Sequence, residues 1–436
     1  MAENQPEYRY LCQKTWHSPN FLTKRPLANY IYGLIIMRKL HQTGGVMPDT
    51  KTYLNLRNCV ENLSRNPGAE IIRYGRNRKD VLSLAQGEGD SPTPEFIMDA
   101  AQKALSEGKT FYSAVLGHDE FRQEIANYYE RIYKLTLPTN RIFITGSGTT
   151  AMHIALTALL DEDDEVVAVT PIWKNLLGAI ELAEARIREV ALDENDGHWS
   201  LDTNKLFDAV TQKTKVILIT TPSNPTGWVM ESEQIREVLE FARANGIWIV
   251  SDEVYGRLTY DRPHAPSFLE FAEPDDKLFT VNSFSKAWAM TGWRLGWLVG
   301  PANADDAVRD IAIYDNMGPP NFTQYGAMEA MRHGEAFIRE QLDLWQSNMD
   351  LLFERFEAIE EITAQRPQSS FYAFFRVKGK ENCMDFAREL IDEVGLSLAP
   401  GCSFGQVGQG YMRLCFAVSR PKLEEALDRL ESAVKG

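Results

Sequence analysis

Short apolar runs alternate with longer amphipathic stretches in the middle of the chain. The apolar runs are rich in β-branched residues, which is typical of buried strands, and the amphipathic stretches between them are typical of helices. Strands that are buried on both faces and joined by helices run parallel. The pattern therefore predicts an α/β fold with a mostly parallel sheet between helices. The predicted strands are RIFIT (141–145), EVVAVT (165–170), KVILIT (215–220), GIWIVSD (246–252), LFTV (278–281) and RLGWLV (294–299).

Beyond residue 300 the pattern becomes rich in helices and predicts a second, smaller α+β region. It starts with a long amphipathic stretch over about 323–356 that would link the two regions. Near the other end of the chain, apolar residues in 81–84 predict a strand that packs with this second region, and a helix follows Pro92 and Pro94. The further predicted elements are a strand over 371–377, a helix over 384–394, strands over 396–401 and 411–418, and a terminal helix.

Residues 1–80 have the least regular pattern, with short helices expected over 25–40 and 50–65. This segment contains 13 Lys and Arg against 6 Asp and Glu, whereas the whole chain has a net charge of −15. An acidic chain is a poor match for general nucleic-acid binding. A basic arm on an acidic body predicts that the arm lies across its own or a partner subunit's surface. The alternative is that the arm helps to bind an anionic substrate.

Composition indicates a globular protein. The chain has 436 residues, 44% hydrophobic and 25% charged, which is enough for two domains with large cores. The apolar stretch over 28–37 is interrupted by polar residues and is too short to span a bilayer, and no signal-peptide pattern precedes it. The five cysteines lack CxxC spacing, so we expect reduced thiols in a cytoplasmic protein and no metal site.

One lysine follows a predicted strand in a chemically unusual setting. Lys286 comes directly after the strand over 278–281, between the hydroxyls of Ser283 and Ser285 and eight residues before Arg294. A lysine is a nucleophile only when its proton is easily lost, and burial or a nearby positive charge promotes that loss. Hydroxyls and a guanidinium suit a phosphate dianion. An amine for a carbonyl beside a cradle for a phosphate describes pyridoxal 5′-phosphate (PLP).

Two other strand ends carry compatible chemistry. TGSGTTAM (145–152) is a Gly/Ser turn before a helix, and such a turn offers backbone N–H groups to an anion; it has neither P-loop nor GxGxxG spacing. Asp252 ends a buried strand, where a carboxylate needs a charged partner. A protonated pyridine nitrogen would supply that partner. Ligands of parallel sheets bind at the carboxyl ends of the strands, where all these residues occur.

SFSKAWAMTGWRLGW (283–297) resembles the lysine segment of the class I/II aminotransferases, which are fold-type I PLP enzymes related to aspartate aminotransferase. Further motifs of this family occur in the same order from about Val81 to Ala417. The resemblance implies a large domain with a mostly parallel seven-stranded sheet and a smaller α+β domain. We accordingly expect an arm over 1–80, a large PLP-binding domain over 105–322, and a small domain made of 81–104 and 323–436.

The resemblance also implies a role for individual residues. Lys286 would carry PLP as a Schiff base and then move the Cα proton as a free amine. Asp252 would hold the ring nitrogen positive, and Tyr255 and Asn224 would share the phenolic oxygen. Trp173 would stack on the ring, although a core tryptophan is the competing interpretation. The residues implied for the phosphate are Ser147, Gly148, Thr149, Ser283, Ser285 and Arg294, and those implied for the substrate carboxylate are Gly87, Asn224 and Arg413.

Tyr112 carries the expectation of a homodimer with shared active sites. The tyrosine that it matches in the family reaches the cofactor phosphate of the neighbouring subunit, and two-fold dimers are the commonest oligomers. A solitary tyrosine is otherwise a core-packing residue. Gly87 has a similar alternative, because a glycine in QGEGD also suits a plain strand-to-helix turn.

The expected reaction is transamination between an α-amino acid and a 2-oxo acid by a ping-pong cycle. The same residues also support elimination, replacement, decarboxylation or oxidation, as in aminocyclopropane-carboxylate synthases. A ligand sensor fused to a DNA-binding module is a third interpretation, but residues 1–80 show no clear helix-turn-helix. The substrate side chain stays open, since arginines of the arm (Arg57, Arg73, Arg76, Arg78) favour an acidic one and nearby Trp and Tyr residues an aromatic one.

Overall fold

The computed structural model describes residues 56–76, 78–195 and 197–436. Residues Arg57–Gly436 form one compact unit. The helix expected over 25–40 and the first part of the one over 50–65 lie outside the described residues. In the described part of 50–65 only α2 (Asn58–Glu61) is helical, and α3 (Pro67–Arg76) follows it.

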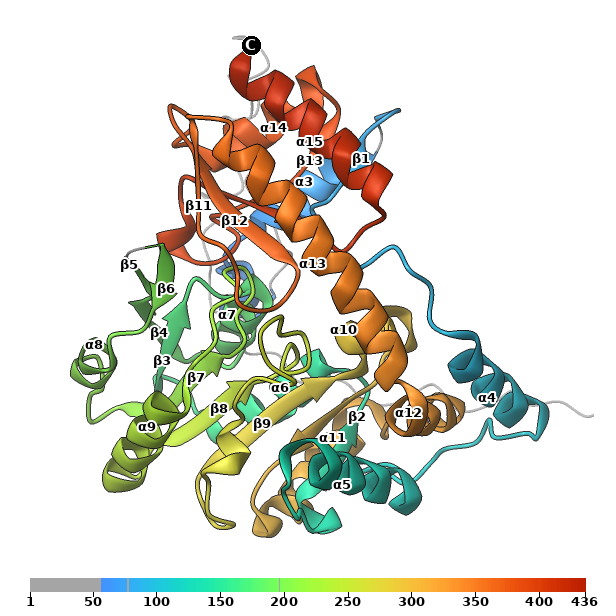
Figure 1. The fold of residues 1–436 in the computed structure, drawn as a ribbon. Helices are drawn as coiled ribbons and strands as arrows, with labels where there is room; N and C mark the ends of the chain where they lie inside the picture. Colours follow the sequence, from blue (N-terminus) through green and yellow to red (C-terminus); the bar gives the residue numbers. More distant parts are fainter. Residues whose placement is uncertain (1–55, 77, 196) are drawn as a thin grey trace, which may run out of the picture. The chain divides into compact units, whose positions relative to one another are not determined.

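A seven-stranded sheet is the centre of this unit, as predicted (Figure 1). Its only antiparallel strand in the described chain is β10, which lies between β2 and β9. The strand expected from Arg294 starts at Gly296, because Arg294 has a left-handed φ of 53° and ends a short 3₁₀ turn. The strand order is β2 (Ile142–Thr145), β10 (Gly296–Val299), β9 (Leu278–Ser283), β8 (Trp248–Asp252), β7 (Thr214–Thr220), β3 (Glu165–Thr170) and β4 (Arg186–Ala191).

Helices cover both faces of this sheet, and the strands divide their side chains between two cores. In β3, Val166 and Ala168 belong to one hydrophobic cluster and Val167 and Val169 to the other, as the two-residue period of a strand requires. The first cluster contains side chains of α6 (Gly148–Leu159), α7 (Lys174–Leu182) and α11 (Asp305–Asn316); the second contains side chains of α5 (Asp119–Tyr133), α8 (Thr203–Asp208) and α9 (Ser232–Asn245).

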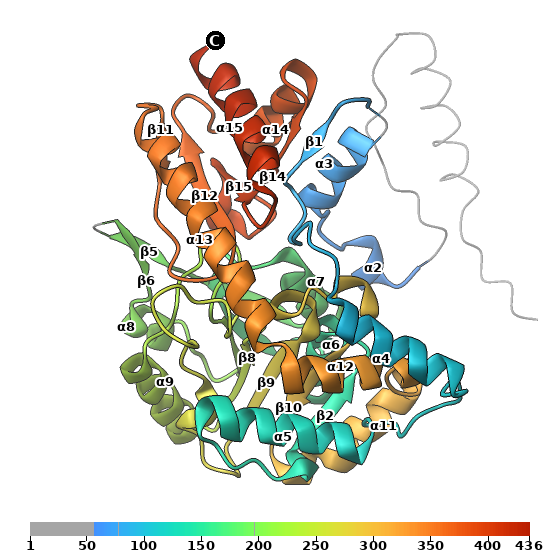
Figure 2. The same ribbon diagram turned by 45° about the vertical axis from the view of Figure 1, so that its right-hand side comes forward.

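A smaller antiparallel sheet forms the other layer (Figure 2). The predicted strand near Val81 is short and pairs in parallel with a strand of the second region, as expected. The sheet has the order β11 (Ile362–Ala364), β12 (Tyr372–Val377), β15 (Tyr411–Cys415) and β14 (Ala399–Pro400), and the separate pair is β1 (Leu82–Ser83) with β13 (Leu396–Ser397). The helices around it are α3, α13 (Glu335–Glu357), α14 (Cys383–Glu393) and α15 (Arg420–Lys435).

The long amphipathic stretch is two helices, α12 (Asn321–His333) and α13 (Glu335–Glu357), separated at Gly334. A Cβ at Gly334 would lie 2.4 Å from the Ala330 carbonyl oxygen and 2.7 Å from the Trp288 ring, so only glycine fits this break. α12 packs on α4 (Glu95–Ser106), the helix predicted after Pro94. A short hairpin of β5 (Asp193–Asn195) and β6 (His198–Ser200) completes the strands. The division into an arm, a large and a small domain stays a prediction.

No helix among the described residues is both long and apolar enough to cross a membrane.

Candidate active site

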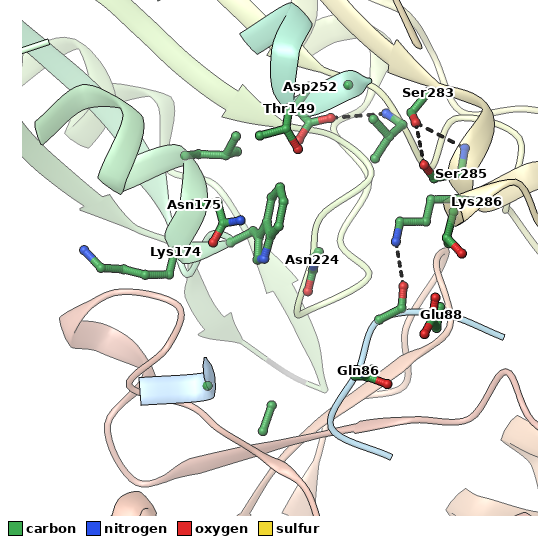
Figure 3. Close-up of a pocket in the computed structure, with 18 of the residues that line it drawn as sticks. Gln86, Glu88, Thr149, Lys174, Asn175, Asn224, Asp252, Ser283, Ser285 and Lys286 are labelled. Atoms are coloured by element: carbon green, nitrogen blue, oxygen red, sulfur yellow. Dashed lines mark hydrogen bonds between the residues drawn. The ribbon is translucent and has the colours of Figure 1, made fainter. Parts of the chain in front are cut away.

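A cavity of about 630 Å³ lies where β7, β8 and β9 end, with β12 and β15 of the smaller sheet contributing its opposite wall (Figure 3). Tyr112 does not line it and is 82% exposed. The arginines that would favour an acidic substrate side chain, Arg57, Arg73, Arg76 and Arg78, do not line it either. The other residues that the resemblance implied for the cofactor, its phosphate and the substrate carboxylate all line this one cavity: Gly87, Ser147, Gly148, Thr149, Trp173, Asn224, Asp252, Tyr255, Ser283, Ser285, Lys286, Arg294 and Arg413.

Lys286 enters the cavity from α10 (Phe284–Ala287), the single turn that follows β9. Its Nζ donates a 2.6 Å hydrogen bond to the carbonyl oxygen of Gly87. Burial, together with the positive charge of Arg413, lowers the pKa of Lys286 to about 8. The amine therefore loses its proton closer to neutral pH than an exposed lysine does, which is what a lysine nucleophile or base requires.

Asp252 is the last residue of β8 and is 6% exposed. Among the described residues, its carboxylate accepts one hydrogen bond, from the N–H of Val254 at 3.3 Å. Burial raises the pKa of Asp252 to about 7, and the charge of Lys286 opposes part of that rise. A buried carboxylate with so few donors favours a cationic partner, and the ring nitrogen of PLP fits this requirement.

The N-terminus of α6 and the end of β9 form a cradle with the donors that a phosphate needs. Ser147 caps the 12-residue helix by accepting the N–H of Thr150 at 2.9 Å, and the first N–H groups of a helix have no partner within it. Ser283 lies across from this turn, 3.0 Å from the hydroxyl of Ser285. A Cβ at Gly148 would be 3.1 Å from that of Ser283, so glycine leaves this space open.

Four side chains form a connected polar group between the two walls of the cavity. Arg413 Nη1 donates to Asn224 Oδ1 at 2.9 Å, Asn224 Nδ2 lies 3.4 Å from the hydroxyl of Tyr255, and that hydroxyl lies 3.0 Å from the hydroxyl of Tyr372. The Arg413 guanidinium stacks 4.3 Å from the centre of the Tyr372 ring. Its buried Nε has no hydrogen-bond partner among the described residues. Such an orphaned donor fits an absent carboxylate ligand.

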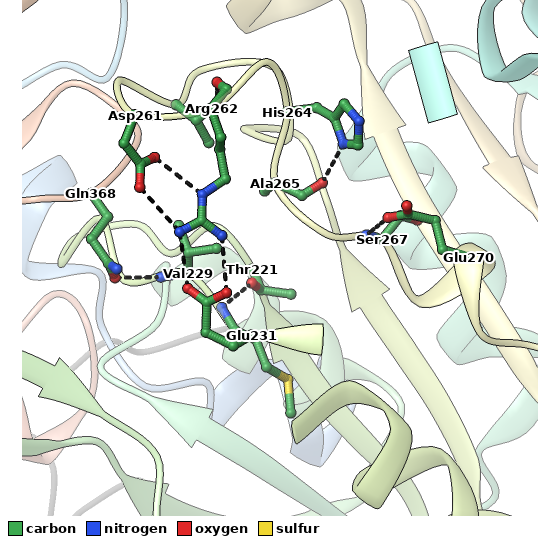
Figure 4. Close-up of polar contacts among 12 residues, drawn as sticks. Thr221, Val229, Glu231, Asp261, Arg262, His264, Ala265, Ser267, Glu270 and Gln368 are labelled. Atoms are coloured by element: carbon green, nitrogen blue, oxygen red, sulfur yellow. Dashed lines mark hydrogen bonds and ion pairs between the residues drawn. The ribbon is translucent and has the colours of Figure 1, made fainter. Parts of the chain in front are cut away.

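Polar contacts behind the cavity hold the turns that carry Asn224 and Tyr255 (Figure 4). Arg262 pairs with Glu231 at 2.9 and 3.1 Å, which ties the loop after β8 to the segment after the Asn224 turn. Thr221 Oγ1 accepts the N–H of Met230 at 2.9 Å and closes that turn. The two turns are therefore braced by residues that do not themselves line the cavity.

Sequence reasoning missed several residues of the cavity. Tyr372 lies in FYAFFRV, which looks like any buried strand, and its hydroxyl was the only signal. Ser403 lines the cavity with a buried hydroxyl that has no partner among the described residues. Asn175 and Lys174 line it as well, and the Lys174 amine points away from the other labelled side chains and binds Glu181 at 2.9 Å (Figure 3).

Comparisons with known proteins agree with this geometry. Residues 79–430 match the family described as Aminotransferase class I and II. The chain is 31% identical to aspartate aminotransferase of Pyrococcus horikoshii, over 86% of this chain and 96% of that enzyme. It is 33% identical to aromatic-amino-acid aminotransferase 2 of Thermococcus litoralis, over 84% and 95%. The structure of Thermus thermophilus aspartate aminotransferase with maleate superposes with a TM-score of 0.81 at 28% identity, covering 87% of this chain and 100% of that one.

The match covers the described unit almost from end to end, and it includes the fold and the reaction class. The chain therefore belongs to the class I and II aminotransferase family and is a PLP-dependent enzyme that transfers the amino group of an α-amino acid to a 2-oxo acid.

Proposed function

We propose that the cavity is the PLP site of this aminotransferase and that Lys286 is the residue to which the cofactor attaches. The observation that carries the proposal is that a lysine with a lowered pKa and a buried, under-paired carboxylate line one cavity beside a phosphate cradle. Asp252 would face the ring nitrogen, Tyr255 and Asn224 the phenolic oxygen, and Trp173 the ring. The phosphate would be held by Ser147, Gly148, Thr149, Ser283, Ser285 and Arg294.

PLP supplies an electron sink for the carbanion formed at the substrate's Cα. The protein's own residues do the rest. Arg413, already aligned by Asn224, binds the α-carboxylate with the help of Gly87. Lys286, as a free amine, would take the proton from Cα and deliver it to the C4′ carbon of the cofactor. The carboxylate of Asp252 would keep the ring nitrogen protonated, and the cationic nitrogen would in turn favour the charged form of this carboxylate, whose pKa burial alone raises.

We propose an acidic or an aromatic α-amino acid as substrate, in a ping-pong cycle with a 2-oxo acid. The proposal follows the names of the relatives, which are aspartate and aromatic-amino-acid aminotransferases. The cavity is also lined by Asn66, Asn175 and Ser403, which can donate hydrogen bonds to a side-chain carboxylate or hydroxyl, and by Ile72, which can pack on a ring.

We further propose a homodimer in which Tyr112 acts in the site of the second subunit, and a cytoplasmic location. Large exposed side chains support the dimer, since exposed apolar and aromatic residues mark interaction surfaces. They are Phe111 (80% exposed), Tyr112 (82%), Tyr314 (89%) and Met317 (42%). Asn321 Nδ2 donates to the carbonyl oxygen of Phe111 at 3.0 Å and holds this segment against α12.

The test mixes the purified protein with a panel of single amino acids and follows the cofactor's absorbance together with the organic products. We expect conversion of PLP to pyridoxamine phosphate with release of the matching 2-oxo acid, and no conversion in Lys286→Ala. Borohydride reduction followed by peptide mapping is expected to find the cofactor on the peptide that contains residue 286. Loss of CO₂ or of a leaving group in place of that conversion, or cofactor bound elsewhere, would contradict the proposal.

A further inference from the structure

We propose that Tyr372 is a positioning residue for Tyr255: its hydroxyl donates to the Tyr255 hydroxyl, 3.0 Å away, and so directs the proton of Tyr255 towards the cofactor's phenolic oxygen. This inference rests on the proposed PLP site. Tyr372 lies on β12 of the smaller sheet, whereas Tyr255 follows β8 of the larger one, so the pair joins the two walls of the cavity.

A count of donors and acceptors gives the direction of this hydrogen bond. A hydroxyl has one proton to donate and two lone pairs. Asn224 Nδ2 can only donate to the Tyr255 hydroxyl, at 3.4 Å. If Tyr255 also donated to Tyr372, it would have no proton left for the cofactor. With Tyr372 as the donor, both lone pairs of Tyr255 are used and its proton is free to point into the cavity.

The surroundings of Tyr372 favour this donor role. The Arg413 guanidinium lies 4.3 Å from the ring centre, and a nearby positive charge makes a phenol a stronger hydrogen-bond donor. Tyr372 is fully buried, and its aromatic neighbours along the same segment, Phe371 and Phe374, have no hydroxyl. Packing alone would thus accept phenylalanine at position 372.

Gly87 is shaped to admit this hydroxyl. A Cβ on Gly87 would lie 2.4 Å from Tyr372 Oη but 3.3 Å from its Cζ, so the severe clash is with the hydroxyl, while the contact with the ring is only tight. Gly87 has no left-handed φ, so its backbone does not itself demand glycine. We infer that Gly87 and the Tyr372 hydroxyl are a complementary pair, in addition to the contact of the Gly87 carbonyl with Lys286.

The first test titrates the absorbance of the PLP-loaded enzyme with pH. Hydrogen bonds donated to the phenolic oxygen stabilise the cofactor form in which this oxygen carries more negative charge. A stronger donor therefore lowers the pH midpoint of the absorbance change. In Tyr372→Phe we expect the midpoint to rise by about half to one pH unit, the size of one neutral hydrogen bond. Tyr260→Phe is the matched control, because it removes a hydroxyl that bonds the Ser370 carbonyl oxygen at 2.5 Å outside the cavity.

Two outcomes distinguish failure of the proposed PLP site from failure of the proposed role of Tyr372. A wild-type enzyme without cofactor absorbance would overturn the proposed function. Normal absorbance in the wild type with an unshifted midpoint in Tyr372→Phe would overturn only the role of Tyr372.

The second test measures thermal midpoints of the PLP-loaded Gly87→Ala, Tyr372→Phe and double variants. We expect Gly87→Ala to lower the thermal unfolding midpoint of the wild type. The same substitution should lower the thermal midpoint of Tyr372→Phe by clearly less, because the hydroxyl oxygen that is closest to the new Cβ is then gone. An equal cost in both backgrounds would refute the pairing of Gly87 with the hydroxyl. If Tyr372→Phe alone does not fold, the hydroxyl is needed for the fold, and the positioning role is rejected.

Discussion

Two ionisable side chains of the cavity have pKa values moved towards neutrality for the same reason. Burial penalises the charged form of both, so the pKa of Lys286 is lowered to about 8 and that of Asp252 is raised to about 7. A structural ion pair would have moved both values the other way. Buried ionisable groups with few hydrogen-bond partners and shifted pKa values are characteristic of ligand-binding and catalytic sites.

At pH values above the folded-state pKa of Asp252, which is about 7, the charged carboxylate destabilises the PLP-free protein. A carboxyl whose pKa is about 7 when folded and about 3.9 when unfolded stabilises the fold fully below the lower value. That contribution is lost as the pH rises from the lower value through the folded one. Asp252→Asn removes the loss, so we expect the PLP-free variant to be more stable than the PLP-free wild type by about 2–4 kcal/mol at about pH 8.

Thermal or urea unfolding of the PLP-free proteins checks this prediction. The advantage of Asp252→Asn should shrink towards about pH 5. Asp276→Asn is a control of opposite sign, because the burial of Asp276 is outweighed by its pairing with Arg243 at 2.6 Å, which lowers its pKa. That variant should be less stable at high pH. The same Asp252→Asn substitution should weaken PLP binding, and a variant that is destabilised without PLP would contradict the account.

At the scale of elements, the phosphate cradle depends on a close approach between β10 and the start of α6. Gly296 of β10 is the contact point, since a Cβ there would lie 2.5 Å from the backbone nitrogen of Gly148 and 2.7 Å from the carbonyl oxygen of Asn282. Both neighbours are backbone atoms and cannot rotate away. The antiparallel strand β10 therefore brings the N-terminus of α6 next to the end of β9.

We expect Gly296→Ala to destabilise the protein by about 1–3 kcal/mol and to weaken PLP binding together with stability. Gly178→Ala is the matched control: this glycine is inside α7, and a Cβ there would meet no atom of another element within 4 Å, so alanine should be neutral or stabilise by roughly 0.5–1 kcal/mol. Urea unfolding and PLP titration of both variants provide the measurements. Equal behaviour of the two variants would show that the contact at Gly296 is not limiting.

At the scale of the whole molecule, Tyr112 is the residue that the resemblance implied for the cofactor phosphate and that lies outside the cavity. Tyr112 and Phe111 are both exposed by four-fifths, which is unusual for two adjacent aromatic residues of a single chain. The proposed homodimer explains both facts, since it would cover these residues and bring Tyr112 to the second cavity. Core packing, the alternative interpretation of Tyr112, does not agree with its exposure.

Mixing two inactive variants tests the shared sites. In a hybrid of Tyr112→Ala and Lys286→Ala chains, the cavity with an intact Lys286 would receive Tyr112 from the other chain. Random reassortment makes half of the dimers mixed, each with one complete site of two, so activity should recover to roughly a quarter of wild type. If the activity of the mixture does not exceed the mean activity of the two variants, the active sites are not shared between subunits. A mixture of Tyr314→Ala and Lys286→Ala chains controls for general effects of substitutions on the exposed surface.

Local sequence determined those features in which a short segment carries its own physical reason. Buried parallel strands such as β3, β7 and β8 could be predicted closely, because they are covered on both faces and their apolar runs need no partner to be recognised. The position of Asp252, Lys286 and the Ser147 turn at the ends of β8, β9 and β2, around one cavity, could be predicted too, because these residues are unusual where they occur. Their roles stay predictions.

Only tertiary structure decided the features that depend on contacts between distant segments. The edge strand β4 was missed because its RIREVA sequence alternates charged with apolar residues, and the break at Gly334 depends on Trp288 of another element. Tyr372 has no distinguishing sequence signal, and its importance comes from Gly87 and Tyr255, which are far from it along the chain. Hydrophobic periodicity specifies which side chains are buried, but which polar atoms meet inside is settled only when the two sheets pack together.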